Sequence, residues 1–321
     1  MRRHTCYVDI ARRRGNSPVS SLKVKVGPGS NWGVTIVRFL SFRIDNQHSF
    51  GALVENRVVD LGRRMSGYQN LREVIAAGAL VRAKDIAAES SADYELAELT
   101  LAPPVPEPGK VICIEAGNVS DADREPDHPH VYLRTAESLV GHLQHLLIPL
   151  ESTRLDCRGA LALIVGSGGR RITEKAARDA IAGITLANDT TVGDWPLPGG
   201  QHSALARNFP QIGSIGPWLV TLDDITDFDD LVVTTRINDD EKQQSSSARL
   251  PFSLSYLISY LSSFLLLKPG DVILIAPPQQ APGDQLADCT LAPGDQVEIE
   301  NPDLGKLSNS VVAESETIDT D

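Results

Sequence analysis

The chain has 321 residues, and 41% of them are hydrophobic, which is enough to bury a sizeable core in one larger domain beside a small one. Its net charge is −12, although seven of its 30 Lys and Arg residues lie within residues 1–34 beside a single acid, Asp9. An acidic body repels phosphate backbones, and no apolar run reaches the ~18 residues of a membrane span, so we expect no nucleic-acid partner, no membrane insertion and a cytoplasmic location.

The two chain ends differ in composition from the body. Residues 1–34 lack the apolar core of a secretory signal and are predicted to be a basic flexible extension. Residues 314–321 are polar and acidic and are predicted to be disordered. The four cysteines are scattered and form no Cys-x-x-Cys pair, which indicates free thiols in a reducing compartment.

The first half of the body predicts a small domain over residues 35–103. Residues 37–39, 50–54 and 57–61 alternate in polarity, as half-buried antiparallel strands do. Two short helices are expected at 71–77 and 83–88. The following segment holds prolines at 103, 104, 106 and 108, which predicts a stiff connector and a domain boundary.

The second half predicts a larger domain over residues 108–313. Strands are expected at 110–114, 161–165, 184–187 and 231–238, and an amphipathic helix at 253–265. Another helix is expected at 173–181, with Thr173 as N-cap and Gly183 as C-cap. Two Pro-Gly-Asp turns introduce further strands at 270–275 and 296–299.

Several short motifs occur along the chain in a characteristic order. They are Gly117-Asn118, Tyr132-Leu133-Arg134 with Ser138, Asn188-Asp189-Thr190-Thr191 with Asp194, Ile215-Gly216-Pro217-Trp218, Lys268-Pro269-Gly270-Asp271-Val272-Ile273 and Leu304-Gly305-Lys306-Leu307. This order and spacing resembles the fumarylacetoacetate hydrolase superfamily over residues 37–312. The resemblance implies an α+β, mostly β fold, a β-sandwich-like roll with a small β-rich N-terminal domain, in a homodimer. It also implies a Mg or Mn ion that holds a β-dicarbonyl substrate for carbon–carbon cleavage, decarboxylation or isomerisation.

The metal-binding motif departs from the family pattern, which reads roughly D-Y-E-x-E-L-x-x-V-I-G with both glutamates as ligands. Arg158 and Ala160 occupy the two glutamate positions, and only Asp189 remains of the implied ligands. Because Mg and Mn require several oxygen ligands, we expect no metal cofactor and predict an Asp189–Arg158 ion pair. The alternatives are a rebuilt Mg or Mn site, and an Asp189 that caps a turn through Thr191.

The implied acid–base motif, G-x-N-Y-x-x-H-x-x-E, is also altered. Ala122 replaces the histidine while Glu125 remains, and Arg207 lies where the family often has lysine. The candidate catalytic residues are Glu125, Arg158, Asp189 and Asp194. The candidate substrate-binding residues are Arg134, Ser138, Thr191, His202 and Arg207.

Two further features have competing interpretations. His128-Pro129-His130 could ligate a metal with a nearby carboxylate, but a loop that resembles the family's lid is the favoured interpretation. Cys157 could be an activated thiol beside Arg158, but packing is the favoured interpretation.

The first functional hypothesis is an enzyme without a catalytic metal that cyclises, isomerises or eliminates from a dicarbonyl or polyketide-like small molecule, as in secondary metabolism. Arginine charge would stabilise the enolate in place of a metal. The alternatives are a residual metal-dependent hydrolase or decarboxylase of a β-dicarbonyl acid, and a non-catalytic partner of an active paralogue.

Overall fold

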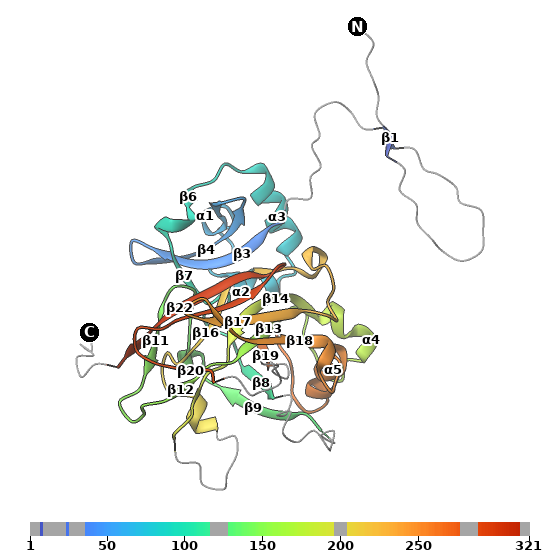
Figure 1. The fold of residues 1–321 in the computed structure, drawn as a ribbon. Coiled ribbons are helices and arrows are strands. Elements are labelled where there is room, and N and C mark those ends of the chain that lie inside the picture. The colour runs from blue at the N-terminus through green and yellow to red at the C-terminus, as the bar shows by residue number, and fades with distance from the viewer. Residues whose placement is uncertain are drawn as a thin grey trace. The chain divides into compact units, whose positions relative to one another are not determined.

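The computed structural model describes residues 36–115, 128–195, 204–276 and 288–314, together with the backbone of Tyr7–Val8 (β1) and Val24–Lys25 (β2). The chain divides into two compact units, Met1–Thr35 and Ile36–Asp321. In the first unit, β1 and β2 pair antiparallel. The second unit holds all the other elements and is shown in Figure 1.

A twelve-stranded sheet forms the centre of the second unit. Its main path runs β6-β5-β4-β3-β16-β14-β13-β19-β8-β9, while β10 pairs with β16 and β7 with β3. The strands are β3 (Arg38–Ile44), β4 (Gln47–Val54), β5 (Arg57–Asp60), β6 (Tyr94–Glu95), β7 (Thr100–Ala102), β8 (Val111–Glu115), β9 (His130–Arg134), β10 (Leu139–Val140), β13 (Gly159–Val165), β14 (Ile181–Asn188), β16 (Gly213–Val220) and β19 (Val272–Ala276).

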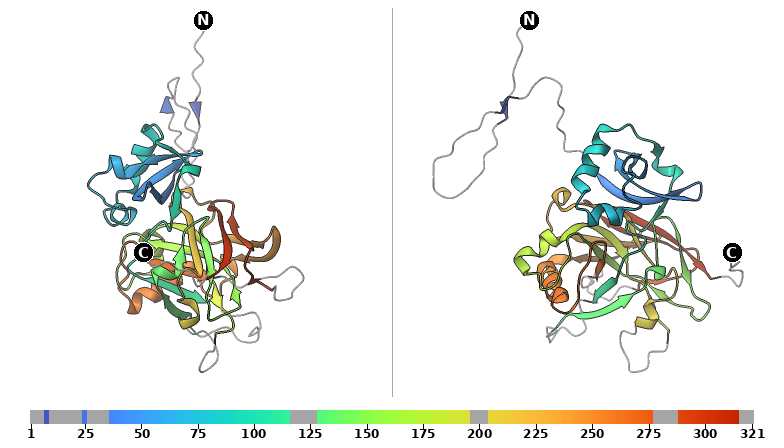
Figure 2. Two further views of the ribbon diagram at one scale, coloured as in Figure 1. Left: turned by 90° about the vertical axis from the view of Figure 1, so that its left-hand side faces the viewer. Right: turned by 180° about the vertical axis from the view of Figure 1, so that it is seen from behind.

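Two smaller sheets complete the β structure. The five-stranded sheet has the order β11-β22-β21-β17-β18, and the three-stranded sheet has the order β15-β12-β20. Their strands are β11 (His145–Ile148), β12 (Leu155–Asp156), β15 (Thr191–Val192), β17 (Val232–Ile237), β18 (Asp240–Ser246), β20 (Thr290–Leu291), β21 (Gln296–Asn301) and β22 (Gly305–Ala313). Figure 2 shows the red strands of the five-stranded sheet as a layer beside the large sheet.

The helices are short and lie on the outside of the sheets. They are α1 (Leu61–Arg64), α2 (Leu71–Ala76), α3 (Leu80–Glu89), α4 (Glu174–Ala177) and α5 (Leu254–Phe264), with 3₁₀ turns η1 (Leu96–Glu98), η3 (Ala136–Ser138), η4 (Arg178–Ala180), η5 (Ala204–Arg207), η6 (Leu222–Asp224) and η7 (Ser247–Arg249). Helices α1 to α3 pack against strands β3 and β4. Helix α5 follows its prediction closely, because the Ser253 hydroxyl accepts from the Tyr256 N–H and the buried residues recur at helical spacing.

Strand alternation places the core on both faces of the large sheet. On β13, Leu161 and Leu163 pack toward one hydrophobic cluster, which contains residues of the five-stranded sheet. The intervening Ala160 and Ala162 belong to a second cluster with residues of α1 to α3. Because a strand sends successive side chains to opposite faces, the fully buried run 159–165 serves both layers.

The predicted mostly β architecture is confirmed, and one local prediction is corrected. Strand β3 pairs with β16 through Phe39 and Leu219, so one sheet contains strands from both predicted domains, 35–103 and 108–313. The helix expected at 173–181 is only α4 followed by η4. Thr173 makes no side-chain cap bond, and Gly183 lies inside β14 rather than ending the helix.

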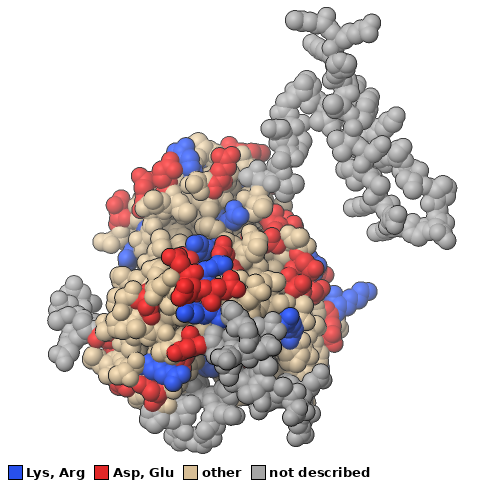
Figure 3. All heavy atoms as spheres, in the orientation of Figure 1, with Lys and Arg blue, Asp and Glu red and all other residues tan. Residues whose placement is uncertain are grey.

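Surface charges in the second unit are mixed. Exposed ion pairs join Arg236 to Glu300 and Glu241, and Lys306 to Glu298, on the five-stranded sheet. On the face drawn in Figure 3, basic side chains are interspersed with acidic ones. In the described part of the chain, no helix is long and apolar enough to cross a membrane.

Candidate active site

Five buried charged residues meet beside strands β8, β9, β13 and β14 of the large sheet. Glu115 is the last residue of β8, Arg134 the last of β9, Arg158 directly precedes β13, Asp189 directly follows β14, and Arg207 ends η5. All five side chains are at least nine-tenths buried. We call these residues the arginine–carboxylate cluster, and it contains three cations and two anions.

The alternation of the strands explains why these residues converge. On β8, Val111 and Cys113 face the second hydrophobic cluster, so Glu115 points the same way. By the same alternation, Asp189 should lie on the same face as Ala187 of β14, and Arg158 on the same face as Ala160 of β13.

Asp189 is the most heavily paired member of the cluster. Its Oδ1 accepts from Arg134 Nη1 at 2.6 Å, and its Oδ2 accepts from the Tyr132 hydroxyl at 2.5 Å and from Arg207 Nη1 at 3.1 Å. Burial acts to raise the pKa of Asp189, but Arg207, Arg134 and these hydrogen bonds outweigh it and hold the pKa below its ordinary value. Asp189 is therefore a carboxylate that fixes two cations.

The predicted Asp189–Arg158 ion pair is corrected by this geometry. Arg158 Nη1 lies 3.3 Å from Glu115 Oε1, and its Nη2 donates to the Ala276 carbonyl at 3.3 Å. Asp189 contacts the backbone of Arg158 instead, through an N–H···O bond of 2.9 Å. The side chains that bind the Asp189 carboxylate are those of Tyr132, Arg134 and Arg207.

Arg158 and Arg207 respond differently to the same buried surroundings. Burial lowers the pKa of Arg158, and the nearby carboxylates Glu115 and Asp189 only partly oppose it. Burial also acts to lower the pKa of Arg207, but Asp189, Tyr132 and Glu115 more than compensate and raise it. Arg207 also lies over the Tyr132 ring, 4.7 Å from its centre.

The other predicted substrate-binding and catalytic residues are dispersed. Ser138 supports the cluster, because its hydroxyl accepts from Arg134 Nε at 3.2 Å. Thr191 is half-buried on β15 and pairs with Asp156 of β12. Asp194 is exposed and accepts hydrogen bonds from the N–H and hydroxyl of Thr153 and from the Ser152 hydroxyl, outside the cluster. Glu125 and His202 lie outside the described residues.

Two site residues were missed as functional candidates in the sequence. Glu115 follows the apolar run 111–114, and a charged residue that ends a buried strand on the same face as Val111 was a usable signal. Tyr132 was recognised only as part of a motif. Its phenol donates to Asp189, and burial, reinforced by the Asp189 charge, raises its pKa far above the ordinary value.

The histidines near the site have other partners. His130 Nδ1 lies 3.7 Å from Glu115 Oε2, and the His128 ring stacks on Tyr260 with 6.5 Å between centres. Within residues 36–115, 128–195, 204–276 and 288–314, no three His, Cys, Asp or Glu side chains are grouped as metal ligands.

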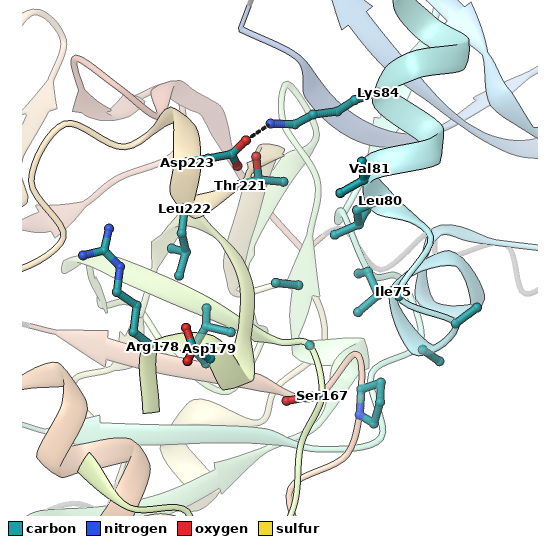
Figure 4. A pocket seen from close by; sticks show the side chains of 17 residues that line it. Ile75, Leu80, Val81, Lys84, Ser167, Arg178, Asp179, Thr221, Leu222 and Asp223 are labelled. Carbon is teal, nitrogen blue, oxygen red and sulfur yellow. Dashed lines mark hydrogen bonds and ion pairs between the residues drawn. The ribbon is translucent and has the colours of Figure 1, made fainter. Parts of the chain in front are cut away.

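A separate cavity of about 820 Å³ lies between α2–α3 and the segments around η4 and η6. Ile75, Leu80 and Leu222 line its apolar part, and Lys84 spans its edge to Asp223 at 2.7 Å, as Figure 4 shows. None of the predicted site residues is among its described lining residues.

Comparison with known proteins agrees with the fold. Residues 111–312 match the family described as "Fumarylacetoacetate (FAA) hydrolase C-terminal". The chain is 32% identical to oxaloacetate tautomerase fahd2, mitochondrial, from Xenopus laevis, over 75% of this chain and 78% of that protein. It is 30% identical to oxaloacetate tautomerase FAHD2A, mitochondrial, from Homo sapiens, over 67% and 70%.

Solved structures extend the similarity to 86–87% of this chain. A probable 2-hydroxyhepta-2,4-diene-1,7-dioate isomerase from Mycobacterium abscessus superimposes with a TM-score of 0.71 at 28% identity, over 87% of this chain and 99% of that one. A putative HpcE protein from Mycobacterium smegmatis gives 0.72 at 26% identity, over 86% and 99%. The chain belongs to the fumarylacetoacetate hydrolase family.

Proposed function

We propose that this chain is an isomerase of anionic 2-oxo acids or β-dicarbonyl compounds that uses buried arginine charge rather than a divalent metal. The observation that carries the proposal is the convergence of three buried guanidinium groups, those of Arg134, Arg158 and Arg207, beside Glu115 and Asp189. Guanidinium groups gathered in one place favour an anionic ligand. Among the reactions expected from the sequence, isomerisation agrees with the names of the tautomerase and isomerase relatives.

The donor set does not fit the Mg or Mn ion that the family resemblance implies. Arg158 and Ala160 stand at two of the implied ligand positions, and both oxygens of Asp189 already accept from Arg134, Tyr132 and Arg207. Hard divalent cations take several oxygen ligands, and three neighbouring guanidinium groups repel them. No step of the proposed reaction therefore passes through a metal.

The proposed reaction moves one proton between carbon and oxygen. A carboxylate takes the proton from the carbon beside the substrate carbonyl, and the resulting enolate oxygen is stabilised by Arg158 and Arg207. Protonation of that oxygen then gives the enol, and the reverse sequence gives the keto form. We assign Glu115 as the proton carrier, because its Oε1 lies 3.3 Å from Arg158 and 3.6 Å from Arg207. Tyr132 and Asp189 hold Arg207 and Arg134 in place.

Enol–keto conversion of oxaloacetate and other 2-oxo dicarboxylates, measured by ultraviolet absorbance with a metal chelator present, tests the proposal. We expect turnover by the wild type, a loss of about 10²–10³-fold in Arg158→Met, and a partial loss in Arg158→Lys, because one donor to a developing oxyanion contributes that much. Arg154→Met is the matched control, since Arg154 is exposed and pairs only with Asp156 among the described ion pairs.

Folding and metal content are checked alongside activity. Circular dichroism establishes that Arg158→Met is folded, and malonate should raise the unfolding temperature of the wild type but not of this variant. Three results would reject the proposal: wild-type turnover in folded Arg158→Met, no turnover across the panel, or turnover that requires added Mg or Mn. The last result would support the metal-dependent hydrolase or decarboxylase alternative.

A further inference from the structure

Cys157 and Cys289 lie opposite each other beside the arginine–carboxylate cluster. Strands β12 and β20 pair antiparallel, with Leu155 opposite Leu291 and Asp156 opposite Thr290. The next pair in this register is Cys157 and Cys289, and the Cys157 N–H donates to the Cys289 carbonyl at 2.9 Å. Residues hydrogen-bonded across antiparallel strands have Cα atoms ~5.5 Å apart, within the ~4.4–6.8 Å that a disulfide spans.

The two thiols have different surroundings. The amide of Gln243, on β18, donates to Cys289 Sγ at 2.6 Å. The interaction with Cys157 lowers the pKa of Cys289 although burial opposes it, whereas the interaction with Cys289, together with burial, raises the pKa of Cys157. Cys289 is also the more exposed of the two, at 7% against 3%. It is therefore the better nucleophile.

We propose that Cys157 and Cys289 form a reversible disulfide by exchange with a low-molecular-weight disulfide. The Cys289 thiolate attacks one sulfur of the small disulfide, which leaves a mixed disulfide and releases one thiolate. Cys157 then loses its proton and attacks Cys289 Sγ, which releases the second thiolate. Two protein thiols are oxidised to one disulfide, and one small disulfide is reduced to two thiols.

The position of the pair gives the disulfide a structural consequence. Cys157 directly precedes Arg158, so the bond ties the backbone that leads to Arg158 across to β20. Any effect of oxidation on turnover rests on the proposed function. Formation of the disulfide itself does not depend on that function, and mass spectrometry detects it without an activity assay. Failure of one proposal can therefore be distinguished from failure of the other.

The test uses the full chain with Cys6→Ser, so that Cys113, Cys157 and Cys289 are the remaining cysteines. Incubation with oxidised glutathione should remove two of three reactive thiols in denatured samples and decrease the intact mass by two hydrogen atoms. Non-reducing peptide mapping should join the peptides of Cys157 and Cys289, and dithiothreitol should restore both thiols. Buried Cys113 lies on β8 opposite Tyr132 and Leu274, so Cys113→Ala should leave the result unchanged.

Gln243 supplies a variant that leaves both cysteines in place. Gln243→Met removes the donor to Cys289 at similar volume and should slow oxidation several-fold, whereas Gln244→Met, at the exposed neighbouring position, should not. Retention of all three thiols would overturn the proposal. Glutathione held on Cys289 with Cys157 unreacted, or equal oxidation rates in the two Gln variants, would do the same.

Discussion

The arginine–carboxylate cluster and the ion pairs on the five-stranded sheet use the same groups at similar distances. Arg134–Asp189 is 2.6 Å long with side chains 0% and 2% exposed, and Arg236–Glu300 is 2.8 Å long with side chains 31% and 45% exposed. Burial makes the difference, because a buried charge that loses its partner cannot regain water.

Removal of the central carboxylate should produce the largest difference in stability between the two regions. Asp189→Asn leaves Arg134 and Arg207 without their shared counter-ion, and we expect a loss of about 3–5 kcal/mol in the free energy of unfolding. Glu300→Gln, in the exposed set, should cost less than about 1 kcal/mol. Urea unfolding at neutral pH measures both variants, and equal losses would show that burial does not separate the two regions.

A half-buried histidine, His142, extends the comparison to a group that is neutral at pH 7. His142 Nδ1 accepts from the Ser308 N–H at 3.0 Å, and burial, with a smaller contribution from Lys306, lowers its pKa to about 4. Between pH 6.5 and pH 4, His142 is mostly protonated in the unfolded chain and mostly neutral in the folded chain. This contribution to stability is therefore complete above pH 6.5 and is lost as the pH falls toward 4, by up to about 3 kcal/mol.

His142→Gln isolates this effect, because glutamine can accept the same hydrogen bond without titrating. Between pH 7 and pH 4, the free energy of unfolding of the wild type should fall by up to about 3 kcal/mol more than that of the variant. His145→Gln, at an exposed position of β11, is the control. Parallel pH profiles for wild type and His142→Gln would contradict the assignment.

The sequence could predict strands and motif positions, but not which charges pair. The family motif placed Arg158 and Asp189 in one site, and both lie in the cluster. Their partners depend on tertiary register: Tyr132 and Arg134 come from β9, which reaches Asp189 only through the β8–β9 pairing. Thr173 shows a second limit, since a favourable N-cap residue occupies its position without making the cap bond.

Loss of a neutral side chain that contacts the cluster should lower the free energy of unfolding less than loss of a charged member. The buried Ser138 hydroxyl accepts from Arg134 Nε and donates to the Thr135 carbonyl at 2.8 Å. Ser138→Ala removes both contacts but no charge, so we expect a loss of about 1–2 kcal/mol in urea unfolding. A loss as large as that of Asp189→Asn would mean that hydrogen bonding to Arg134, rather than charge pairing, holds the cluster.

The smallest effect is expected at Asp194, which the sequence placed among the catalytic candidates. Asp194 is exposed, and its carboxylate accepts from the Thr153 N–H at 3.0 Å in a surface turn. Because water replaces these bonds readily, Asp194→Ala should lower the free energy of unfolding by about 0.5–1 kcal/mol. Oxaloacetate turnover should stay within about twofold of the wild type, because a residue in an exposed turn should change the activation free energy by much less than the ~1.36 kcal/mol that corresponds to a tenfold change in rate. A loss of about a hundredfold or more in a folded Asp194→Ala variant would place Asp194 in the reaction. The site would then extend from the buried cluster to the exposed turn.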